Sequence, residues 1–274
     1  MTTQARRGRG RPKSSFKETT APTMQVLDRA LTVLDALANG GATTLTVLSE
    51  ECDIPTATTH RILSTLQQRG YAAFDDITQE WAIGIAAYRT GTAYLNRTTL
   101  LDVSRPVMRR LMEETGETAN LAVRDGMTVV FIGQVEATHP IRAFFNPGTR
   151  TAMHASGTGK AILAALPPTT IDALLAQTTL EPFTERTLAT PAALANDLAR
   201  TRERGWSFDR EERHAGMSCI GAAIQNAAGE VIAGVSISGP SSRFTDDRIT
   251  LFGAIVQQAA AEITEALGGK GNEA

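Results

Sequence analysis

The sequence predicts an α+β protein of two domains, in which a small winged helix-turn-helix precedes a larger domain built from an antiparallel sheet covered by helices. Three observations support this class. Residues 45–71 hold two short helical patterns separated by a turn that contains proline, and residues 71–83 have the pattern of a hairpin. From Glu117 onward, alternating strand patterns are interrupted by helical ones, which is typical of an α+β domain. The length of 274 residues suits two domains.

The helix-turn-helix follows from the spacing of apolar residues in its two halves. Leu45 and Leu48 recur at a helical interval, and Pro55 then interrupts the helix because proline disfavours a helical conformation in the residue before it. A second helix begins at Thr56, which we expect to cap it, and ends at Gly70. Its apolar stripe is Ile62, Leu63 and Leu66, and its outward face consists of Ala57, His60, Arg61 and Ser64. A helix held in this way can place its N-terminal side chains near base edges in a major groove of DNA.

A helical hairpin in an enzyme shows a similar pattern, but the flanking segments favour DNA binding. Residues 26–37 form a strongly apolar helix, which supplies the third helix that the small core requires. Residues 71–74 and 81–83 are expected to form two short strands around the polar turn 75–79. Such a hairpin is the wing of a winged helix.

The amino terminus is strongly basic. Six positive charges precede the first acidic residue, Glu18, and they are Arg6, Arg7, Arg9, Arg11, Lys13 and Lys17. This tail, residues 1–23, has few apolar side chains, so the sequence predicts disorder until it binds a partner. Arg9-Gly10-Arg11-Pro12 resembles the core of an AT-hook, whose extended arginines lie in a narrow A·T minor groove. A tail that only increases solubility is the alternative, and its position beside a winged helix favours nucleic acid.

Charge and composition exclude several classes of protein. The formal net charge is −2, and the rest of the chain carries −8 once the six tail charges are removed. Basicity is therefore concentrated at one end, where a polyanion would bind. No apolar run approaches the roughly 20 residues of a membrane helix, so we expect a cytoplasmic protein with no membrane partner. Cys52 and Cys219 lie in different predicted domains without further ligands at metal-binding spacing, so no disulfide, metal or cofactor is expected.

The second domain alternates between predicted strands and helices. Strands are expected at 118–123, 128–135, 141–145, 206–209, 217–225 and 231–238, and helices at 100–115, 157–165, 169–176, 191–204 and 246–267. Pro106 either kinks the first of these helices or marks its start. A helical segment at 84–95 has apolar residues on more than one side, and we expect it to link the domains and to help pair subunits.

Strand geometry predicts a small polar cluster in this domain. Because side chains alternate between the faces of a strand, Ser236 and Ser238 share one face, opposite to Val231, Ala233, Val235 and Ile237. If residues 226–229 form a tight hairpin, Cys219 lies directly across from Ser236. Asp209 on the preceding strand would border the cluster. Small residues that pack under a helix and satisfy one another are the alternative.

The stretch that begins at His154 runs from a strand end into a helix start. Free amides at Gly157 and Thr158, with the positive helix end behind them, would form a carboxylate site. A nucleotide-binding loop is disfavoured because His154 replaces the first glycine of that motif. A hydrolase using Ser156, His154 and Asp209 is the rival enzyme hypothesis, although the sequence has no Gly-x-Ser-x-Gly elbow at this serine.

Several motifs together resemble the IclR-type transcriptional regulators. They are the winged helix around 55–66, HASGTGKAILAALP at 154–167, the run from Arg204 to Glu212, and GMSCIGAAIQNAAGEVIAGVSISGP at 216–240. The likeness spans nearly the whole chain from Met24, and the basic tail, ETANLAV and IRAFFNPGTR are similar to regulators of glyoxylate assimilation. The resemblance implies a GAF-like effector-binding domain, a homodimer or dimer of dimers, and control of operons by small carboxylates such as glyoxylate or pyruvate.

The resemblance also implies site residues. The ligand contacts of the family fall here on the backbone of Gly157 and Thr158 and on the side chains of Asp209, Cys219, Ser236 and Ser238. Phe144, Phe145 and Met153 are expected as apolar walls. For DNA we expect contacts from Thr56, Thr58, His60 and Arg61, with Arg61 best suited to guanine or phosphate, and from Arg9 and Arg11 of the tail. Ala57 and Thr59 depart from the serine and valine that are common in the family.

These predictions combine into one organisation: a basic tail at 1–23, a winged helix at 24–86, a linker helix at 87–100 and an effector-binding domain at 101–270. The expected function is regulation of transcription without catalysis. Double-stranded operator DNA binds the first domain, and a two- or three-carbon oxoacid in the second changes the affinity for DNA by about 1 to 3 kcal/mol. A DNA-binding scaffold without a ligand is the remaining alternative.

Overall fold

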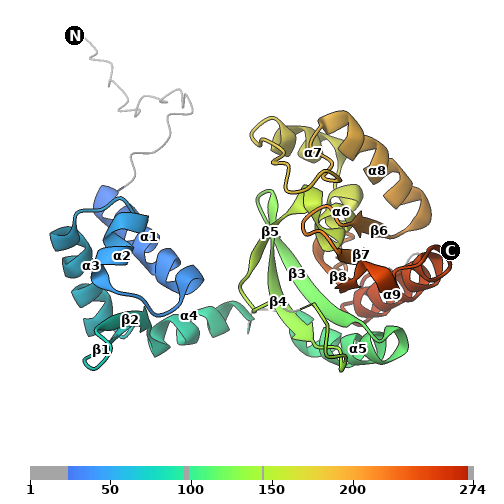
Figure 1. Cartoon of the computed structure of the whole chain (residues 1–274). Helices are drawn as coiled ribbons and strands as arrows, with labels where there is room; N and C mark the ends of the chain where they lie inside the picture. Colours follow the sequence, from blue (N-terminus) through green and yellow to red (C-terminus); the bar gives the residue numbers. More distant parts are fainter. Residues whose placement is uncertain (1–23, 96–98, 144, 271–274) are drawn as a thin grey trace, which may run out of the picture. The chain divides into compact units, whose positions relative to one another are not determined.

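The computed structural model describes residues 24–95, 99–143 and 145–270 (Figure 1). The chain divides into two compact units, the first ending at Gly91 and the second beginning at Thr92. Each unit has its own hydrophobic core. Within the part of the chain that is described, no helix combines the length and the apolarity needed to cross a membrane.

The first unit is a winged helix-turn-helix, as predicted. Its elements are α1 (Gln25–Gly40), α2 (Leu45–Glu51), α3 (Thr56–Gln68), β1 (Ala72–Asp75) and β2 (Glu80–Ile83), and α4 (Ile85–Leu95) follows the wing. Val33, Leu37, Leu48, Leu63 and Trp81 form the centre of the core, and each is at most 5% exposed. A pair of backbone hydrogen bonds between Thr43 and Trp81 joins the segment before α2 to the wing.

Hydrogen bonds across the turn hold α2 against α3. The predicted cap at Thr56 is wrong, because its hydroxyl lies 3.0 Å from Ser49 Oγ of α2 and makes no cap bond to its own helix. Ser49 in turn donates to the carbonyl of Ile54 over 2.7 Å. Thr59 is fully buried, and its hydroxyl donates to the same carbonyl over 3.2 Å, so this polar core position is satisfied. These bonds orient α3 relative to α2.

The second unit contains a six-stranded antiparallel sheet with helices on both faces, which confirms the predicted α+β class (Figure 1). The strand order is β5-β4-β3-β8-β7-β6. The strands are β3 (Thr118–Asp125), β4 (Thr128–Val135), β5 (Arg150–Ala152), β6 (Ser207–Arg210), β7 (Met217–Gln225) and β8 (Val231–Pro240). The helices are α5 (Leu100–Thr115), α6 (Gly157–Ala165), α7 (Pro168–Leu175), α8 (Pro191–Arg204) and α9 (Asp246–Ala266), with short 3₁₀ turns η1 (Met153–Ala155) and η2 (Ser241–Arg243).

Two cores cover the two faces of this sheet. On one face, α5 and α9 pack on residues such as Leu121, Ile220 and Val235 and form the larger core with them. On the other face, α6, α7 and α8 pack on Ala122 and Phe131. Pro106 lies inside a continuous α5, so it does not mark a helix start.

One predicted strand is wrong. Residues 141–145 do not form a strand in the described chain, and Arg150–Ala152 pairs with β4 instead. The alternation of apolar residues in this segment is misleading because Ile141 is 73% exposed while Ala143 is buried. The segment is held by a side chain, since Thr118 donates from Oγ1 to the carbonyl of Ala143 over 2.9 Å.

The register of β7 and β8 also differs from the prediction. Gln225 pairs with Val231 and Ile224 with Ala233, so the turn is one residue longer than expected and Ile232 is an extra residue in a bulge. Val231 consequently packs in the core under α6, on the face opposite to the one predicted. A shift of one residue exchanges the faces of a strand, but two such shifts restore them. Ser236 and Ser238 therefore remain on the same face as Cys219.

Candidate functional site

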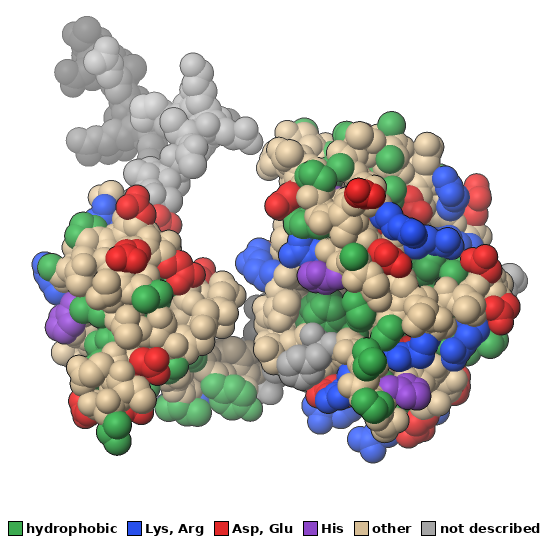
Figure 2. All heavy atoms as spheres, in the orientation of Figure 1, with side chains coloured by type: hydrophobic (Ala, Val, Ile, Leu, Met, Phe, Trp, Pro, Cys, Tyr) green, Lys and Arg blue, Asp and Glu red, His purple; other side chains and the backbone are tan. Residues whose placement is uncertain are grey.

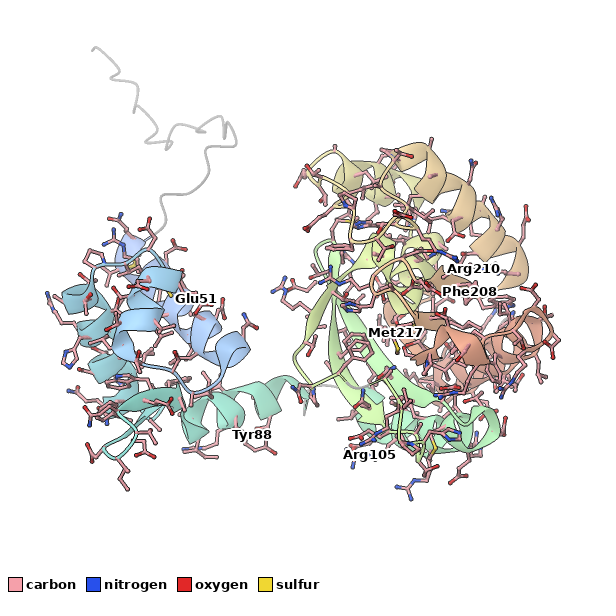
Figure 3. All side chains as sticks on the ribbon, viewed as in Figure 1. Glu51, Tyr88, Arg105, Phe208, Arg210 and Met217 are labelled. Atoms are coloured by element: carbon pink, nitrogen blue, oxygen red, sulfur yellow. The ribbon has the colours of Figure 1, made fainter. Side chains whose placement is uncertain are left out.

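The polar cluster lies where β6, β7 and β8 run side by side. Asp209 pairs with Cys219, and Cys219 pairs with Ser238, so three polar side chains form a row across the sheet. Ser236 lies diagonally from Cys219, whereas it was expected directly opposite. Figure 3 shows this end of the sheet, with Phe208 and Arg210 of β6 near Met217 at the start of β7.

Hydrogen bonds from neighbouring elements hold the two serines. Asn120 of β3 donates from Nδ2 to Ser238 Oγ over 3.2 Å, and Thr158 of α6 donates from Oγ1 to Ser236 Oγ over 2.7 Å. Burial, together with the negative charge of Asp209, raises the pKa of the Cys219 thiol above its ordinary value. At neutral pH Cys219 is therefore a neutral thiol, and Ser236 and Ser238 add two oriented hydroxyl groups.

The N-terminus of α6 faces this row. Ser156 caps the helix by accepting a hydrogen bond from the amide of Gly159 over 3.3 Å. The amides of Gly157 and Thr158 have no helical carbonyl to bind, as is general for a first turn, and the amide of Thr158 points to the Cys219 thiol. The helix dipole adds partial positive charge at this position. The row of side chains thus has two backbone donors beside it.

Glycines permit the close contact between α6 and β7. A Cβ at Gly157 would lie 2.7 Å from Cys219 Sγ and 2.8 Å from the Cys219 carbonyl oxygen. A Cβ at Gly221 would lie 2.7 Å from the backbone nitrogen of Thr158. Because real Cβ atoms do not approach this closely, both positions require glycine if the helix end is to lie on the strand.

A cavity of about 50 Å³ lies at this place. Its lining consists of Phe131, Phe145, Thr151, Ala155, Ser156, Asp209, Arg213, His214, Met217, Ser218, Cys219 and Ser238. Phe131 and Phe145 stack with ring centroids 4.7 Å apart and form an aromatic wall. Phe145 was expected there and Phe131 was missed. Met153 lies in the core under α6 and is not part of the lining, and Phe144 lies outside the described residues.

The Asp209 carboxyl is the most perturbed acid of the site. It is 6% exposed, and burial raises its pKa to about 7, with a further contribution from the negative charge of Glu212. The charge of Lys160 and the Glu212 amide lower the pKa of Asp209 in part, and that amide donates to Asp209 Oδ1 over 2.7 Å. Near neutral pH the carboxyl exists in both protonation states.

A fully buried lysine stands behind the site. Lys160 Nζ donates to the carbonyl of Phe208 and to Glu212 Oε1, each over 2.6 Å, and lies 2.9 Å from Asp197 Oδ2. Burial raises the pKa of Glu212, although the lysine opposes this. The ammonium thereby anchors the end of β6, which carries Asp209. This role of Lys160 was not predicted from the sequence, although a lysine within the otherwise largely apolar run GTGKAILAA was a signal.

The structure does not assemble the alternative hydrolytic triad. His154 Nε2 bonds the carbonyl of Glu181 at 2.9 Å, and its ring stacks on Phe183. Ser156 caps α6, and Asp209 accepts from the Glu212 amide. Within the described chain, none of the hydrogen bonds joins two of the three proposed catalytic side chains.

A larger hollow of about 470 Å³ lies elsewhere in the second unit, between α6, α8, β7 and α9. Alanines and the amides Gln225, Gln257 and Gln258 form much of its lining, and it contains none of the predicted ligand residues. The smaller cavity is therefore the better candidate site, because its lining combines Ser156, the N-cap of α6, with the buried carboxyl group of Asp209.

On the first unit, α3 exposes the residues expected to contact DNA. Thr56, His60 and Arg61 are exposed and Thr58 is partly exposed, all near the N-terminus of the helix. The His60 ring also meets the edge of Trp81, with centroids 6.5 Å apart. Arg61 is the cation on this part of α3, which suits contact with guanine or phosphate.

Acidic residues outnumber basic ones in the first unit. Residues 24–91 contain eight aspartates and glutamates and four arginines. Figure 2 shows acidic side chains spread over the visible face of this unit. Arg9 and Arg11 lie outside the described residues. The six cations of the tail therefore form the main run of positive charge that precedes the helix-turn-helix in the sequence.

Comparison with known proteins adds independent evidence. Residues 26–76 match the model of the IclR helix-turn-helix domain, and residues 92–265 match that of the bacterial transcriptional regulator IclR C-terminal domain. The chain is 45% identical to the HTH-type transcriptional regulator BhcR of Paracoccus denitrificans (strain Pd 1222), over 96% of this chain and 95% of that protein. It is 43% identical to the transcriptional repressor IclR of Escherichia coli (strain K12), over 95% of this chain and 96% of that protein.

A solved structure shows the same fold. The crystal structure of the Thermotoga maritima IclR superposes with a TM-score of 0.71 at 28% identity, covering 90% of this chain and all of that one. The family assignment from the sequence therefore agrees with the fold of both units. The chain belongs to the IclR family of DNA-binding transcriptional regulators, which carry an effector domain and are not enzymes.

Proposed function

We propose that this regulator binds operator DNA through α3 and the basic tail, and that a small oxo-carboxylate in the cavity of the second unit changes that affinity. Glyoxylate is the first candidate effector and pyruvate the second. The target genes would serve glyoxylate or glycolate assimilation in the cytoplasm, and the working form would be a homodimer or a dimer of dimers. The 45% identity to BhcR, over nearly the whole chain, supports this choice among the members of the family.

One observation carries the proposal for the ligand. The Cys219 thiol, the hydroxyl of Ser238 and the Asp209 carboxyl group line a cavity of only about 50 Å³, and α6 begins directly after Ser156, which also lines it. Backbone amides at a helix start bind carboxylates, and hydroxyl groups donate to or accept from an adjacent oxo or hydrated carbon. The volume and the stack of Phe131 on Phe145 favour an acid of two or three carbons.

The proposed regulation is coupling between two binding sites. An effector that binds one arrangement of the regulator more tightly than another shifts the population toward that arrangement. A coupling of about 1 to 3 kcal/mol would change operator affinity roughly 5- to 150-fold.

Calorimetric titration of the full chain with glyoxylate, and separately with pyruvate, tests the site. Ser238→Ala should weaken binding because it removes a hydroxyl that lines the cavity. Ser104→Ala is a matched control, since Ser104 is a fully buried serine of α5 whose hydroxyl has no hydrogen-bond partner. Equal heats for the wild type and both variants would reject the assigned pocket. No heat for the wild type with either acid would favour a scaffold without a ligand.

Mobility-shift titration with DNA from upstream of the gene tests the coupling. Operator affinity should change within the stated range when the acid is added, and the Ser238→Ala variant should need more acid for the same change. Operator affinity that is identical with and without saturating acid would contradict regulation by this ligand.

A further inference from the structure

The Asp209 carboxyl group has one oxygen without a partner, and the cavity lies beside it. Its Oδ1 accepts from the Glu212 amide over 2.7 Å, whereas no hydrogen bond of the described residues reaches Oδ2. The residue is 94% buried and lines the cavity. Asp209 Oδ2 is not among the fully buried polar atoms that lack a partner in the described chain, so this oxygen is accessible from the cavity. A proton or a ligand donor that enters the cavity can therefore reach it.

The charges around Asp209 do not balance. Asp197, Asp209 and Glu212 are three carboxyl groups near two cations, the buried ammonium of Lys160 and the guanidinium of Arg204, whose charge acts on Asp197 and Glu212. The lysine already makes contacts of 2.6 to 2.9 Å with Glu212, Asp197 and the Phe208 carbonyl, and none with Asp209. Fully ionised, this group of five carries an excess of one negative charge, and none of the ion pairs of the described chain includes Asp209. A carboxylate ligand would raise the excess to two beside Asp209.

None of the other charged or titratable groups around the cavity forms an ion pair with Asp209 in the described chain, although Arg213 also lines the cavity. Burial and the charge of Asp209 raise the pKa of the Cys219 thiol, so it is neutral around pH 7. Burial and the neighbouring Arg213 lower the pKa of His214, so its ring is neutral there too. The Arg213 guanidinium lies over the Phe183 ring at 3.8 Å. The Arg210 guanidinium lies over Phe208 at 5.2 Å and faces Asp246, 3.6 Å away.

We propose that the cavity binds its small monocarboxylate together with one proton, which Asp209 takes from solvent and holds on Oδ2. This inference rests on the function proposed above. Ligand anion, proton and free regulator combine into one complex, so charge balances and no other reactant is needed. The Oδ2–H group then donates to an oxygen of the ligand, while the amides of Gly157 and Thr158 bind its carboxylate. The class of ligand is thus a monocarboxylate with an acceptor oxygen near the carboxylate, because a dicarboxylate would require a second proton.

This linkage has a definite direction with pH. The pKa of Asp209 in the free protein is about 7, and a bound anion raises it further. Below about pH 6 the proton is already present and the dissociation constant is flat. Above about pH 8 each binding event draws one proton from solvent, so the dissociation constant rises about tenfold per pH unit. The regulator would then respond to the acid less strongly as pH rises.

Calorimetry of the full chain with glyoxylate measures proton uptake from the difference in heat between two buffers that contain no primary amine, that buffer at the pH used and that differ in heat of ionisation. At pH 8.5 the wild type should take up about one proton per ligand, and at pH 5.5 almost none. Asp209→Asn keeps the shape and a donor but does not titrate, so it should bind with no uptake and with a dissociation constant that is flat from about pH 6 to 9. His214→Gln should keep the uptake, which assigns the proton to Asp209.

The outcomes of these titrations distinguish the proton linkage, its assignment to Asp209 and the proposed effector. Binding by the wild type without uptake at pH 8.5 would overturn the proton linkage and leave the proposed effector intact. Uptake that persists in Asp209→Asn, or that disappears in His214→Gln, would move the proton to another group and overturn the assignment. No binding of glyoxylate at either pH would reject both this inference and the proposed effector. The wild-type measurement is sufficient by itself if the Asp209→Asn protein does not fold.

Discussion

The two units place their candidate binding residues in opposite surroundings. Thr56, His60 and Arg61 of the first unit are exposed, whereas Asp209 and Ser238 of the second are 6% and 4% exposed. An exposed polar side chain contributes little to folding, whereas a buried one must be hydrogen-bonded or it destabilises the fold. Substitutions in the first unit should therefore change binding alone. Substitutions behind the pocket should change stability and binding together.

The largest expected effect is a loss of stability in the second unit when its buried lysine is replaced. Lys160→Met would leave the buried carboxyl groups of Glu212 and Asp197 without their cation, and breaking such a buried group costs about 3 to 5 kcal/mol. Urea unfolding followed by tryptophan fluorescence measures this loss. Lys270→Met, at an exposed lysine, should change stability by less than about 0.5 kcal/mol. Equal stability of Lys160→Met and wild type would show that the buried charges do not support the fold.

The next effect depends on pH. Because the folded-state pKa of Asp209 is raised to about 7, the folded chain binds more protons than the unfolded chain between about pH 4 and 7, and stability falls as pH rises through that interval. Asp209→Asn removes this loss, so it should stabilise the protein by on the order of 4 kcal/mol at pH 8 and by less than about 1 kcal/mol at pH 4.

Thermal melts of Asp209→Asn and wild type at the two pH values measure this difference. Asp246→Asn is the control, because the side chain of Asp246 is 95% exposed, and it should change the melting temperature little at either pH. A gain from Asp209→Asn that is the same at pH 4 and pH 8 would argue against a titrating carboxyl group.

An exposed residue of α3 should show the contrasting behaviour. Arg61→Ala should weaken operator binding by about 1 to 3 kcal/mol, since a bidentate arginine contact contributes that much to base discrimination. The urea midpoint should stay at the wild-type value because Arg61 is exposed. Arg69→Ala makes the same charge change beyond the last turn of α3 and should lose less affinity. A loss of stability in Arg61→Ala would break the comparison between the units.

The smallest effect concerns the tail. The first unit has eight acidic and four basic residues, so the tail is expected to supply much of the attraction to phosphate. Replacing Arg9 and Arg11 together with alanine should flatten the plot of log affinity against log salt by roughly two units of slope. Operator titrations at several salt concentrations measure it. A slope equal to that of the wild type would show that these arginines do not contact DNA.

Local signals account for the elements that were predicted well. Pro55 and Gly70 bound α3, and apolar spacing identified α1, α5 and α9, because the start, the end and the buried face of a helix depend on residues a few positions apart. The prediction of a strand at 141–145 was wrong because alternation of apolar residues does not reveal whether a neighbouring strand is free to pair. Its position along the chain is held instead by the distant hydroxyl of Thr118.

The candidate pocket was predictable in part for the same reason. Cys219, Ser236 and Ser238 share a face through strand alternation, which survived the wrong register because two shifts of one residue cancel. Phe131 was missed because it lies on β4, two strands away from β8 in the sheet. No pattern within a short window connects residues that are so far apart along the chain.

The amino-acid order alone determined the helix-turn-helix, the charge of the tail, the alternation of the strands and the helix start at Gly157, because each depends on neighbours in the chain. The tertiary structure decided which hydroxyl faces Cys219, that Lys160 is buried among carboxyl groups, and that Asp209 keeps one oxygen without a partner. The physical reason is that desolvation and charge pairing depend on distances in space. Those distances exist only after α6, α8 and the sheet have packed together.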